Sequence, residues 1–338
     1  PKILMISTYP PEKCGIGKYA QQQVDYLRNQ KNLVDVLAIR GEGKYNMQLD
    51  SSKKISELQN IIKMYDKTII QYHASFYYGD NSNFLNTIRI HCAFKKLFRS
   101  NKNIEVVCHE ISYPLDRNNI GLKKIRDYIE NIYKRRKWED ASSIVFHTKK
   151  ERDIFCDKLK IKLDESRHKI VSPNYYYIKY RDITKEQARM ELNIPQGERI
   201  FLCIGFIQPH KGFDKAAEVF SKIDPKNNKK LYIVGSLRLV YDVTTDYLNK
   251  LKNYSEGYSN IELREEFVSD ELFDTWIIAS DVIVIPYSEI WTSGVLGRAK
   301  LFNKQCIVRE VGGLKEQLDE KDYIFEADEH LLDIISKI

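Results

Sequence analysis

The stretch RIFLCIGFIQPHKGFDKAAEVF, residues 199–220, decides the fold that the sequence predicts. It opens with a continuous apolar run, which is typical of a parallel strand buried on both faces. A turn with Gly205, Lys211 and Gly212 follows, and from Phe213 onward apolar residues recur at helical spacing. A strand, a glycine-containing turn and a helix in this order predict part of a doubly wound α/β domain, with a lysine at the carboxyl end of its strand.

The same alternation of short apolar runs and amphipathic stretches continues on both sides of this segment. The expected strands are 3–7, 34–39, 68–72, 105–108, 143–147, 169–171, 199–205, 231–234, 261–263, 282–285, 305–308 and 323–325. This pattern, repeated in each half, predicts two doubly wound α/β domains of similar size. We place them at residues 1–177 and 178–338, because the stretch SPNYYYIKYRDI at 172–183 breaks the pattern.

Composition excludes several classes of protein. With 338 residues, 43% of them hydrophobic and 30% charged, the chain is an ordinary globular protein of two domains. No apolar run approaches the ~20 residues of a membrane-spanning helix, and no secretory signal peptide is visible. The six cysteines form no CxxC pair, which predicts a reducing, cytoplasmic setting without disulfides or structural zinc. A net charge of +7 permits phosphate, nucleic-acid or membrane contacts without choosing among them.

Three further turns between a strand and a helix carry residue types that bind anions. The first, YPPEKCGIGK at 9–18, places Gly15 and Gly17 before a helix, although Ala20 leaves the GxGxxG pattern incomplete. The second, IPYSEIWTSGVLGRA at 285–299, brings Thr292, Ser293 and Gly294 to a helix start, which suits a diphosphate. The third is VGGLKE at 311–316.

Taken in order, these motifs resemble the group 1 retaining glycosyltransferases of GT-B fold, the family 4-like enzymes. The segments that carry the resemblance are Pro10–Gly17, Gly205–Gly212, Leu231–Gly235, Asp281–Pro286 with Thr292–Gly294, and Val311–Glu316. They span nearly the whole chain. The resemblance implies two facing Rossmann-like domains with a cleft between them, the nucleotide sugar lying mainly on the second domain and the acceptor on the first. For the last helix, 329–338, the resemblance allows two alternatives. It could cross back to the first domain, or that crossing could be truncated.

The resemblance also implies roles for individual residues. Lys211 would hold the donor diphosphate and act in catalysis, and His109 would lie beside the transferred sugar. The remaining donor-site residues would be those that cradle the diphosphate, line the cleft or reach the base, namely Gly15, Gly17, Gly205, Val268, Thr292, Ser293 and Gly294.

Two positions depart from the family pattern. The family has an arginine before the lysine of its phosphate motif, where this chain has Phe206 and Gln208. It also has a pair of glutamates around the phosphate loop; Glu289 stands two residues too far from Gly294 for the first, and Arg298 occupies the place of the second. One hypothesis is that Arg298 replaces the missing arginine as a counter-charge for the diphosphate, and the alternative is that it points to solvent.

The function implied is retaining transfer of a hexosyl group from a nucleoside diphosphate sugar, UDP or GDP, to a saccharide or lipid-linked hydroxyl acceptor in polysaccharide or glycoconjugate synthesis. No metal and no other cofactor is implied, and nucleic acid is not expected as a partner. Two alternatives remain open. One is a sugar-nucleotide epimerase of the same fold, with Glu110 beside His109 as its candidate carboxylate, and the other is a non-catalytic sugar-nucleotide-binding subunit. A nicotinamide dehydrogenase is disfavoured, because the second strand ends in Ile39-Arg40 rather than in an acidic residue.

One segment raises the question of membrane contact. Residues 123–137, KKIRDYIENIYKRRK, place basic residues around a stripe of Ile and Tyr at helical spacing. Such a helix could rest on an anionic membrane at the cytoplasmic face and give access to a lipid-linked acceptor. The alternative is a helix packed by that stripe with its basic face in solvent.

Overall fold

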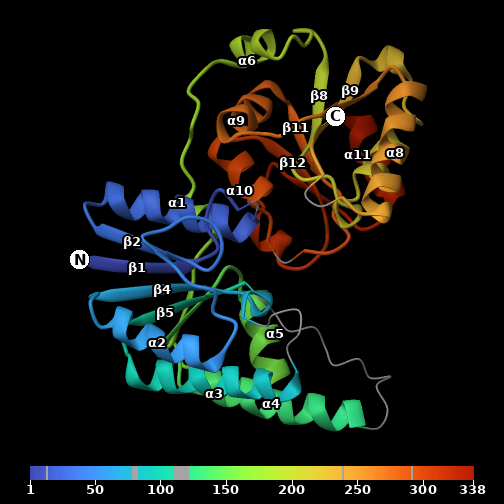
Figure 1. Ribbon diagram of the computed structural model, residues 1–338. Helices are drawn as coiled ribbons and strands as arrows, with labels where there is room; N and C mark the ends of the chain where they lie inside the picture. Colours follow the sequence, from blue (N-terminus) through green and yellow to red (C-terminus); the bar gives the residue numbers. More distant parts are fainter. Residues whose placement is uncertain (13, 78–82, 110–121, 238–239, 291) are drawn as a thin grey trace. The chain divides into compact units, whose positions relative to one another are not determined.

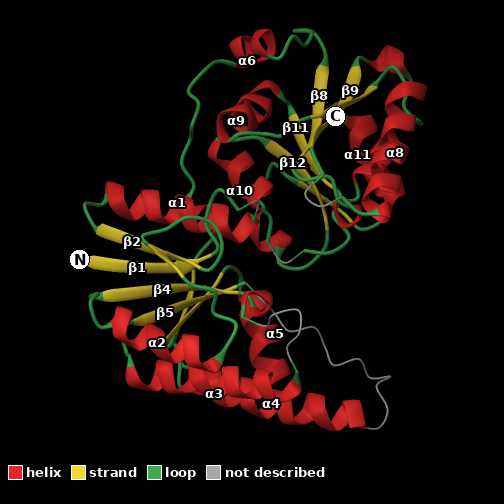
Figure 2. Cartoon of the chain, in the orientation of Figure 1, coloured by secondary structure: helices red, strands yellow, loops and turns green. Residues whose placement is uncertain are grey.

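The computed structural model describes residues 1–12, 14–77, 83–109, 122–237, 240–290 and 292–338 (Figure 1). It has two compact units, Pro1–Tyr176 and Tyr177–Ile338, and each has a hydrophobic core of its own. The predicted boundary between residues 177 and 178 lies one residue further along the chain. Both units are α/β (Figure 2), so the predicted fold class is confirmed.

The first unit is built on a parallel sheet whose described strands lie in the order β3-β2-β1-β4-β5-β6-β7. Figure 1 shows α1 on one face of this sheet and α2, α3 and α4 on the other. The strands are β1 (Lys2–Ser7), β2 (Leu33–Ala38), β3 (Tyr45–Asn46), β4 (Lys67–Tyr72), β5 (Ile104–Cys108), β6 (Ser143–Phe146) and β7 (His168–Ile170). The helices are α1 (Gly15–Asn29), α2 (Ser52–Ile62), α3 (Phe84–Ser100), α4 (Leu122–Glu139) and α5 (Lys149–Leu159).

The second unit repeats this plan with strands in the order β10-β9-β8-β11-β12-β13, again all parallel among the described residues. The strands are β8 (Arg199–Ile204), β9 (Lys229–Gly235), β10 (Ile261–Glu265), β11 (Val282–Ile285), β12 (Gln305–Arg309) and β13 (Tyr323–Phe325). The helices are α6 (Lys185–Glu191), α7 (Phe213–Phe220), α8 (Asp242–Gly257), α9 (Asp270–Ala279), α10 (Gly294–Leu301) and α11 (Asp328–Lys337).

Every strand that the apolar runs predicted is present, within two residues at either end. Central strands such as β1 and β8 are buried on both faces because helices cover both sides of each sheet. The strand that the sequence did not predict is β3, whose two residues pair with the end of β2 at the edge of the first sheet. Two residues are too few to show a periodic pattern, so this strand is recognised only from its pairing with β2.

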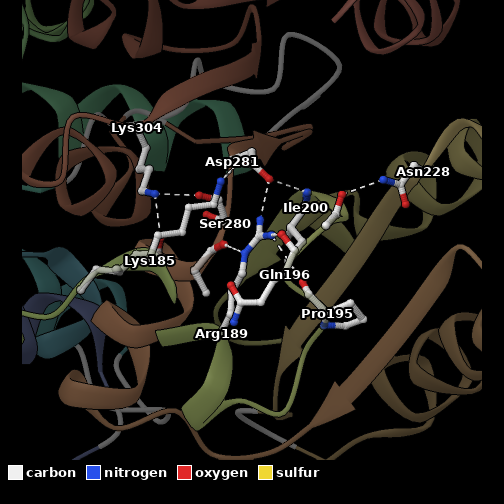
Figure 3. A network of polar contacts seen from close by, with 12 residues as sticks. Lys185, Arg189, Pro195, Gln196, Ile200, Asn228, Ser280, Asp281 and Lys304 are labelled. Carbon is white, nitrogen blue, oxygen red and sulfur yellow. Dashed lines mark hydrogen bonds and ion pairs between the residues drawn. The ribbon is translucent and has the colours of Figure 1, made fainter. Parts of the chain in front are cut away.

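Polar side chains tie α6 to the amino ends of β8 and β11 (Figure 3). The Asp281 carboxylate accepts hydrogen bonds from the Arg189 guanidinium at 2.8 Å and from the Ile200 amide at 2.7 Å, and it also contacts the Lys185 ammonium. Lys304 caps the end of α9 by donating to the Ile278 and Ser280 carbonyls at 2.8 and 2.7 Å. Thr184 and Gln187 form a capping box that opens α6.

For the last helix the sequence left two alternatives, a crossing back to the first domain or a truncated form of that crossing, and the structure places α11 in the second unit. Helix α11 packs against α7 and β13, and its Leu331 and Ile335 are fully buried in the core of the second unit. An amphipathic helix that buries its apolar face in this way belongs to that core.

Candidate functional site

The residues expected to bind the donor lie where the strand order of the second sheet reverses. Strand β8 pairs with β9 on one side and with β11 on the other, so the chain leaves the carboxyl ends of β8 and β11 toward opposite faces of the sheet. Ligands of open α/β sheets bind at such a switch point. We call the described residues that follow these two strands, 205–212, 286–290 and 292–294, the β8–β11 site.

Lys211 is the cation of this site. It ends a short 3-10 turn, Pro209–Lys211, is half-buried, and holds its Nζ 3.9 Å from the centroid of the buried Tyr287 ring. Burial lowers the pKa of Lys211 to about 8. Within the described part of the chain, no carboxylate lies within ion-pair distance of its ammonium. A desolvated cation without a counter-ion is electrostatically suited to receive an anionic ligand.

Backbone contacts hold the two loops of the site together. Gly212 has φ +62°, and a Cβ at this position would lie 2.2 Å from the Pro286 carbonyl oxygen. The Ser288 amide donates to the His210 carbonyl at 2.9 Å. Only glycine allows this close approach, so the local sequence fixes Lys211 next to the loop after β11. Gly205, where the first loop leaves β8, also has a positive φ of +122° and is half-buried.

The loop after β11 ends at the N-terminus of α10, as predicted. Ser293 is the buried N-cap, and its Oγ accepts a hydrogen bond from the Leu296 amide at 3.2 Å. Thr292 is half-buried, and Gly294 is exposed as the first residue of the helix. A Cβ on Gly294 would lie 3.0 Å from the Tyr177 hydroxyl. This helix end therefore offers unpaired amides and a positive dipole end beside the loop that carries Lys211.

The structure overturns the hypothesis for Arg298. Its guanidinium is almost fully buried and binds two carboxylates, Asp270 at 2.9 Å and the fully buried Asp274. Aromatic rings of Tyr180 and Phe273 lie within cation–π distance of it. Arg298 is therefore neither a free counter-charge for a diphosphate nor a solvent-facing side chain, because its charge is already neutralised inside the second unit.

The other two predicted donor-site residues occupy loops at the same edge of the sheet. Val268 is half-buried between β10 and the Ser269 N-cap of α9. Glu289 is exposed in the loop after β11, where its charge acts on His210. Phe206, which stands where the family has an arginine, is half-buried in the loop after β8.

In the first unit, His109 follows β5, and its Nε2 lies 2.6 Å from Gln71 Oε1 of β4. The ring of Tyr19 from α1 packs edge-on against His109 and His147, at centroid distances of 5.5 and 5.2 Å. Burial lowers the pKa of both histidines. They are therefore neutral imidazoles at pH 7, set in a cluster of rings at the carboxyl edge of the sheet.

Sequence reasoning missed Tyr19, Gln71 and His147. A signal for His147 was present, because it ends the apolar run 143–147 in the same way that His109 ends 105–108. Of the two glycines predicted for this unit, Gly15 is exposed at the start of α1 and Gly17 is buried against the Thr8 carbonyl. Glu110, the candidate carboxylate of an epimerase, lies outside the described residues.

Neither a metal-binding cluster nor a membrane-spanning helix is present among the described residues. No group of three or more His, Cys, Asp or Glu side chains is placed to hold a metal ion there. No helix in that part of the chain combines the length and apolar character needed to span a membrane. Helix α4, which contains the whole basic stretch 123–137, packs against α3, while Ile125 and Tyr128 stay 56% and 66% exposed.

Comparison with known proteins identifies the fold. No protein-family model and no curated protein sequence matches the chain. Among solved structures, sucrose-phosphate synthase from Thermosynechococcus elongatus matches 100% of this chain and 89% of its own at 16% identity and TM-score 0.68. HepE of Anabaena in complex with UDP gives the same coverages, 13% identity and TM-score 0.69. A UDP-forming trehalose-phosphate synthase from Burkholderia xenovorans covers 99% and 90%, with 10% identity and TM-score 0.69.

The fold is GT-B. In GT-B terms, the β8–β11 site lies on the second Rossmann-like unit, and the cluster of Tyr19, His109 and His147 lies on the first. The fold predicted from the ordered motifs is thereby confirmed, whereas the donor and the reaction require arguments from the residues themselves.

Proposed function

We propose that this protein is a glycosyltransferase that moves a sugar from a nucleoside diphosphate sugar to a hydroxyl acceptor. The observation that carries the proposal is Lys211, a half-buried cation without a carboxylate partner among the described residues. It lies in the loop whose first residue, Gly205, faces Val295 in the first turn of α10. Two independent sources of positive potential at one switch point suit a diphosphate. The GT-B fold supports this reading, and HepE, which shares it, has been solved with UDP and with UDP-glucose.

The donor is held by its diphosphate in this proposal. The Lys211 ammonium and the amides at Gly294 and Val295 would donate to the phosphate oxygens, and the hydroxyl of Thr292 would add a further donor. UDP is the favoured nucleotide, because the trehalose-phosphate synthase of the same fold is UDP-forming and HepE binds UDP.

Transfer breaks the bond between the anomeric carbon and the phosphate oxygen and forms one between that carbon and the acceptor oxygen. Negative charge grows on the leaving diphosphate, where Lys211 and the α10 amides stabilise it. The acceptor proton passes to the leaving phosphate oxygen on the same face of the sugar, so the anomeric configuration is retained. We assign no protein carboxylate as a nucleophile and no metal to this reaction, and we place neutral His109 beside the transferred sugar.

A nucleotide panel tests the proposal. The thermal shift and calorimetric affinity are measured for UDP, GDP, TDP and ADP and their common sugar conjugates, with wild-type protein and Lys211→Ala. One nucleotide is expected to stabilise the wild type, and Lys211→Ala is expected to lose that effect. No stabilisation by any nucleotide would overturn the donor site.

Product analysis then separates the reactions. A glycosyltransferase gives an acceptor-linked sugar with the donor's anomeric configuration, whereas an epimerase interconverts the nucleotide sugar without any acceptor. A non-catalytic binding subunit gives donor binding without either product. The acceptor is proposed to be a saccharide or lipid-linked hydroxyl of a polysaccharide or glycoconjugate pathway in the cytoplasm.

Membrane contact of α4 is a separate part of the proposal. Its exposed Ile125 and Tyr128 lie among basic residues, which suits the surface of an anionic bilayer. Sedimentation with anionic and with neutral vesicles tests it, with charge reversal at Arg135 and Arg136 expected to reduce binding to the anionic ones. Absence of binding to either vesicle removes this part and leaves the transferase proposal intact.

A further inference from the structure

Four polar side chains form a continuous chain of hydrogen bonds inside the first unit. His109 Nε2 lies 2.6 Å from Gln71 Oε1, and Gln71 Nε2 lies 2.6 Å from Gln23 Oε1. Gln23 in turn hydrogen-bonds the Tyr176 hydroxyl. Gln71 and Gln23 are almost fully buried, at 0% and 1% exposure. Groups that are buried to this degree must satisfy their hydrogen bonds within the protein, so each amide has a defined orientation.

The orientation of Gln71 follows from its neighbours. Its Nε2 faces the thioether sulfur of Met5 at 3.6 Å as well as Gln23 Oε1. A thioether accepts hydrogen bonds and donates none, so the amide nitrogen belongs on this side. Gln23 is oriented in the same sense, because its Oε1 accepts the hydrogen bond from Gln71 Nε2, which leaves its amide nitrogen to donate to the Tyr176 hydroxyl. Gln71 therefore presents its carbonyl oxygen to His109.

The orientation of Gln71 fixes the proton of His109. A carbonyl oxygen only accepts, so Nε2 must carry the hydrogen, and Nδ1 of the neutral ring then keeps its lone pair. Burial, with smaller contributions from the neighbouring His147 and His73, holds the pKa of His109 well below its usual range, which keeps the ring neutral. Among the described residues, Nδ1 has no hydrogen-bond partner.

The neighbouring histidine has the opposite tautomer. His147 Nδ1 lies 3.0 Å from the Val171 carbonyl oxygen, so Nδ1 is its donor and Nε2 keeps the lone pair. The capping box of α5 holds its backbone, since the Glu151 carboxylate accepts from the His147 amide at 2.8 Å. The two rings, 5.2 Å apart between centroids, therefore offer different nitrogens as acceptors.

We propose that Gln71 is a positioning residue that holds His109 as the tautomer protonated on Nε2, so that Nδ1 accepts a hydrogen bond from a hydroxyl group of the sugar or acceptor. The first half of this statement concerns the protein alone. The second half rests on the proposed transferase function. A neutral acceptor suits a carbohydrate hydroxyl, because a hydroxyl supplies the hydrogen that a lone pair requires and carries no charge to bury.

Nitrogen-15 NMR of the histidine side chains in the full chain tests the first half without substrate. In the wild type, His109 is expected to be protonated on Nε2, with a proton that exchanges slowly with water, while His147 shows the opposite pattern. Gln71→Leu is expected to give His109 a mixture of tautomers and fast proton exchange, and Gln71→Glu, which keeps an acceptor, to restore the Nε2 proton. Thr68→Val, a buried change on the same strand, should leave both histidines unchanged.

Two results would overturn the tautomer assignment. One is a wild-type His109 protonated on Nδ1, and the other is a Gln71→Leu protein whose His109 keeps a slowly exchanging Nε2 proton.

Kinetics test the second half. Gln71→Leu is expected to lower kcat/KM about tenfold, the effect of one neutral hydrogen bond, while the Kd for UDP stays within about twofold of the wild type. An unchanged kcat/KM in a variant with altered tautomers overturns the substrate role. Failure of the wild type to transfer any sugar would instead count against the transferase function, and the NMR result would stand by itself.

Discussion

Lys211 is the residue on which the donor site depends, and its protonation predicts a pH dependence. Because its pKa is lowered to about 8, the charged form that attracts a diphosphate dominates below this pH and declines above it. Calorimetry should show UDP affinity falling as pH rises through about 8 in the wild type. Lys211→Arg should shift this fall to higher pH. Lys211→Met should bind roughly 10- to 150-fold more weakly at pH 7, with no fall across this range; a pH-independent wild type would contradict the assignment.

Gly212 carries the backbone geometry of the same site. Gly212→Ala would place a methyl group 2.2 Å from the Pro286 carbonyl in a left-handed conformation. We expect a loss of at least about 1–3 kcal/mol in the free energy of unfolding, measured by urea denaturation. The matched control is Gly197→Ala, since a Cβ there meets nothing within 4 Å. Equal stability of the two variants would mean that the loops of the β8–β11 site can separate freely.

At the scale of elements, Asp281 joins α6 to the sheet of the second unit (Figure 3). Asp281→Asn leaves the buried Arg189 guanidinium, 2% exposed, without its carboxylate, and we expect a loss of about 3 kcal/mol at pH 7. The pKa of Asp281 is lowered by its hydrogen bonds with Lys185 and Ile200, although burial opposes this. Its contribution is therefore present above the unfolded-state pKa of about 4 and is lost as pH falls below it.

Urea denaturation at pH 7 and pH 3 measures that difference between wild type and variant. The control is Asp157→Asn, which removes an exposed pair with Lys160 and should leave the free energy of unfolding nearly unchanged at both pH values. A difference that stays the same at both pH values would exclude the ionised carboxylate as its source.

Arg298 joins α10 to α9 and gives a second prediction at this scale. Arg298→Met leaves the fully buried Asp274 without its cation, so we expect a loss of about 3–5 kcal/mol in unfolding free energy. The UDP affinity of the folded variant should stay within about twofold of the wild type, whereas Lys211→Met loses affinity. Calorimetric measurement of the UDP affinity of both variants tests this expectation. Equal losses of UDP affinity in the two variants would mean that Arg298 does contribute to donor binding.

At the scale of the whole molecule, each unit has its own core, so a ligand of one unit should protect that unit. At a UDP concentration 100 times its Kd, we expect about 2.7 kcal/mol of added protection in the second unit, strongest at 205–212 and 292–298. Hydrogen exchange with mass spectrometry on the full chain measures this by segment. Protection of the core strands β1 and β4 instead would place the nucleotide on the first unit.

The sequence by itself determined the strands, the helix starts and the order of the motifs. These features are local. A continuous apolar run predicts a buried strand such as β8, and Thr184 and Gln187, three residues apart, form the cap that they predict. Their order along the chain was sufficient to predict the GT-B fold and to place Lys211 in the turn after β8.

Only the tertiary structure decided which partners the charged and polar groups have. Arg298 meets Asp274 across 24 residues, and Arg189 meets Asp281 across 92, so no spacing rule indicates either pair. The tautomer of His109 depends on Gln71 and, through it, on Met5 and Gln23 from two other elements. Burial patterns can be predicted from short stretches of sequence, because strands and helices are periodic. Hydrogen-bond partners cannot, because they are set by packing between elements that lie far apart in the sequence.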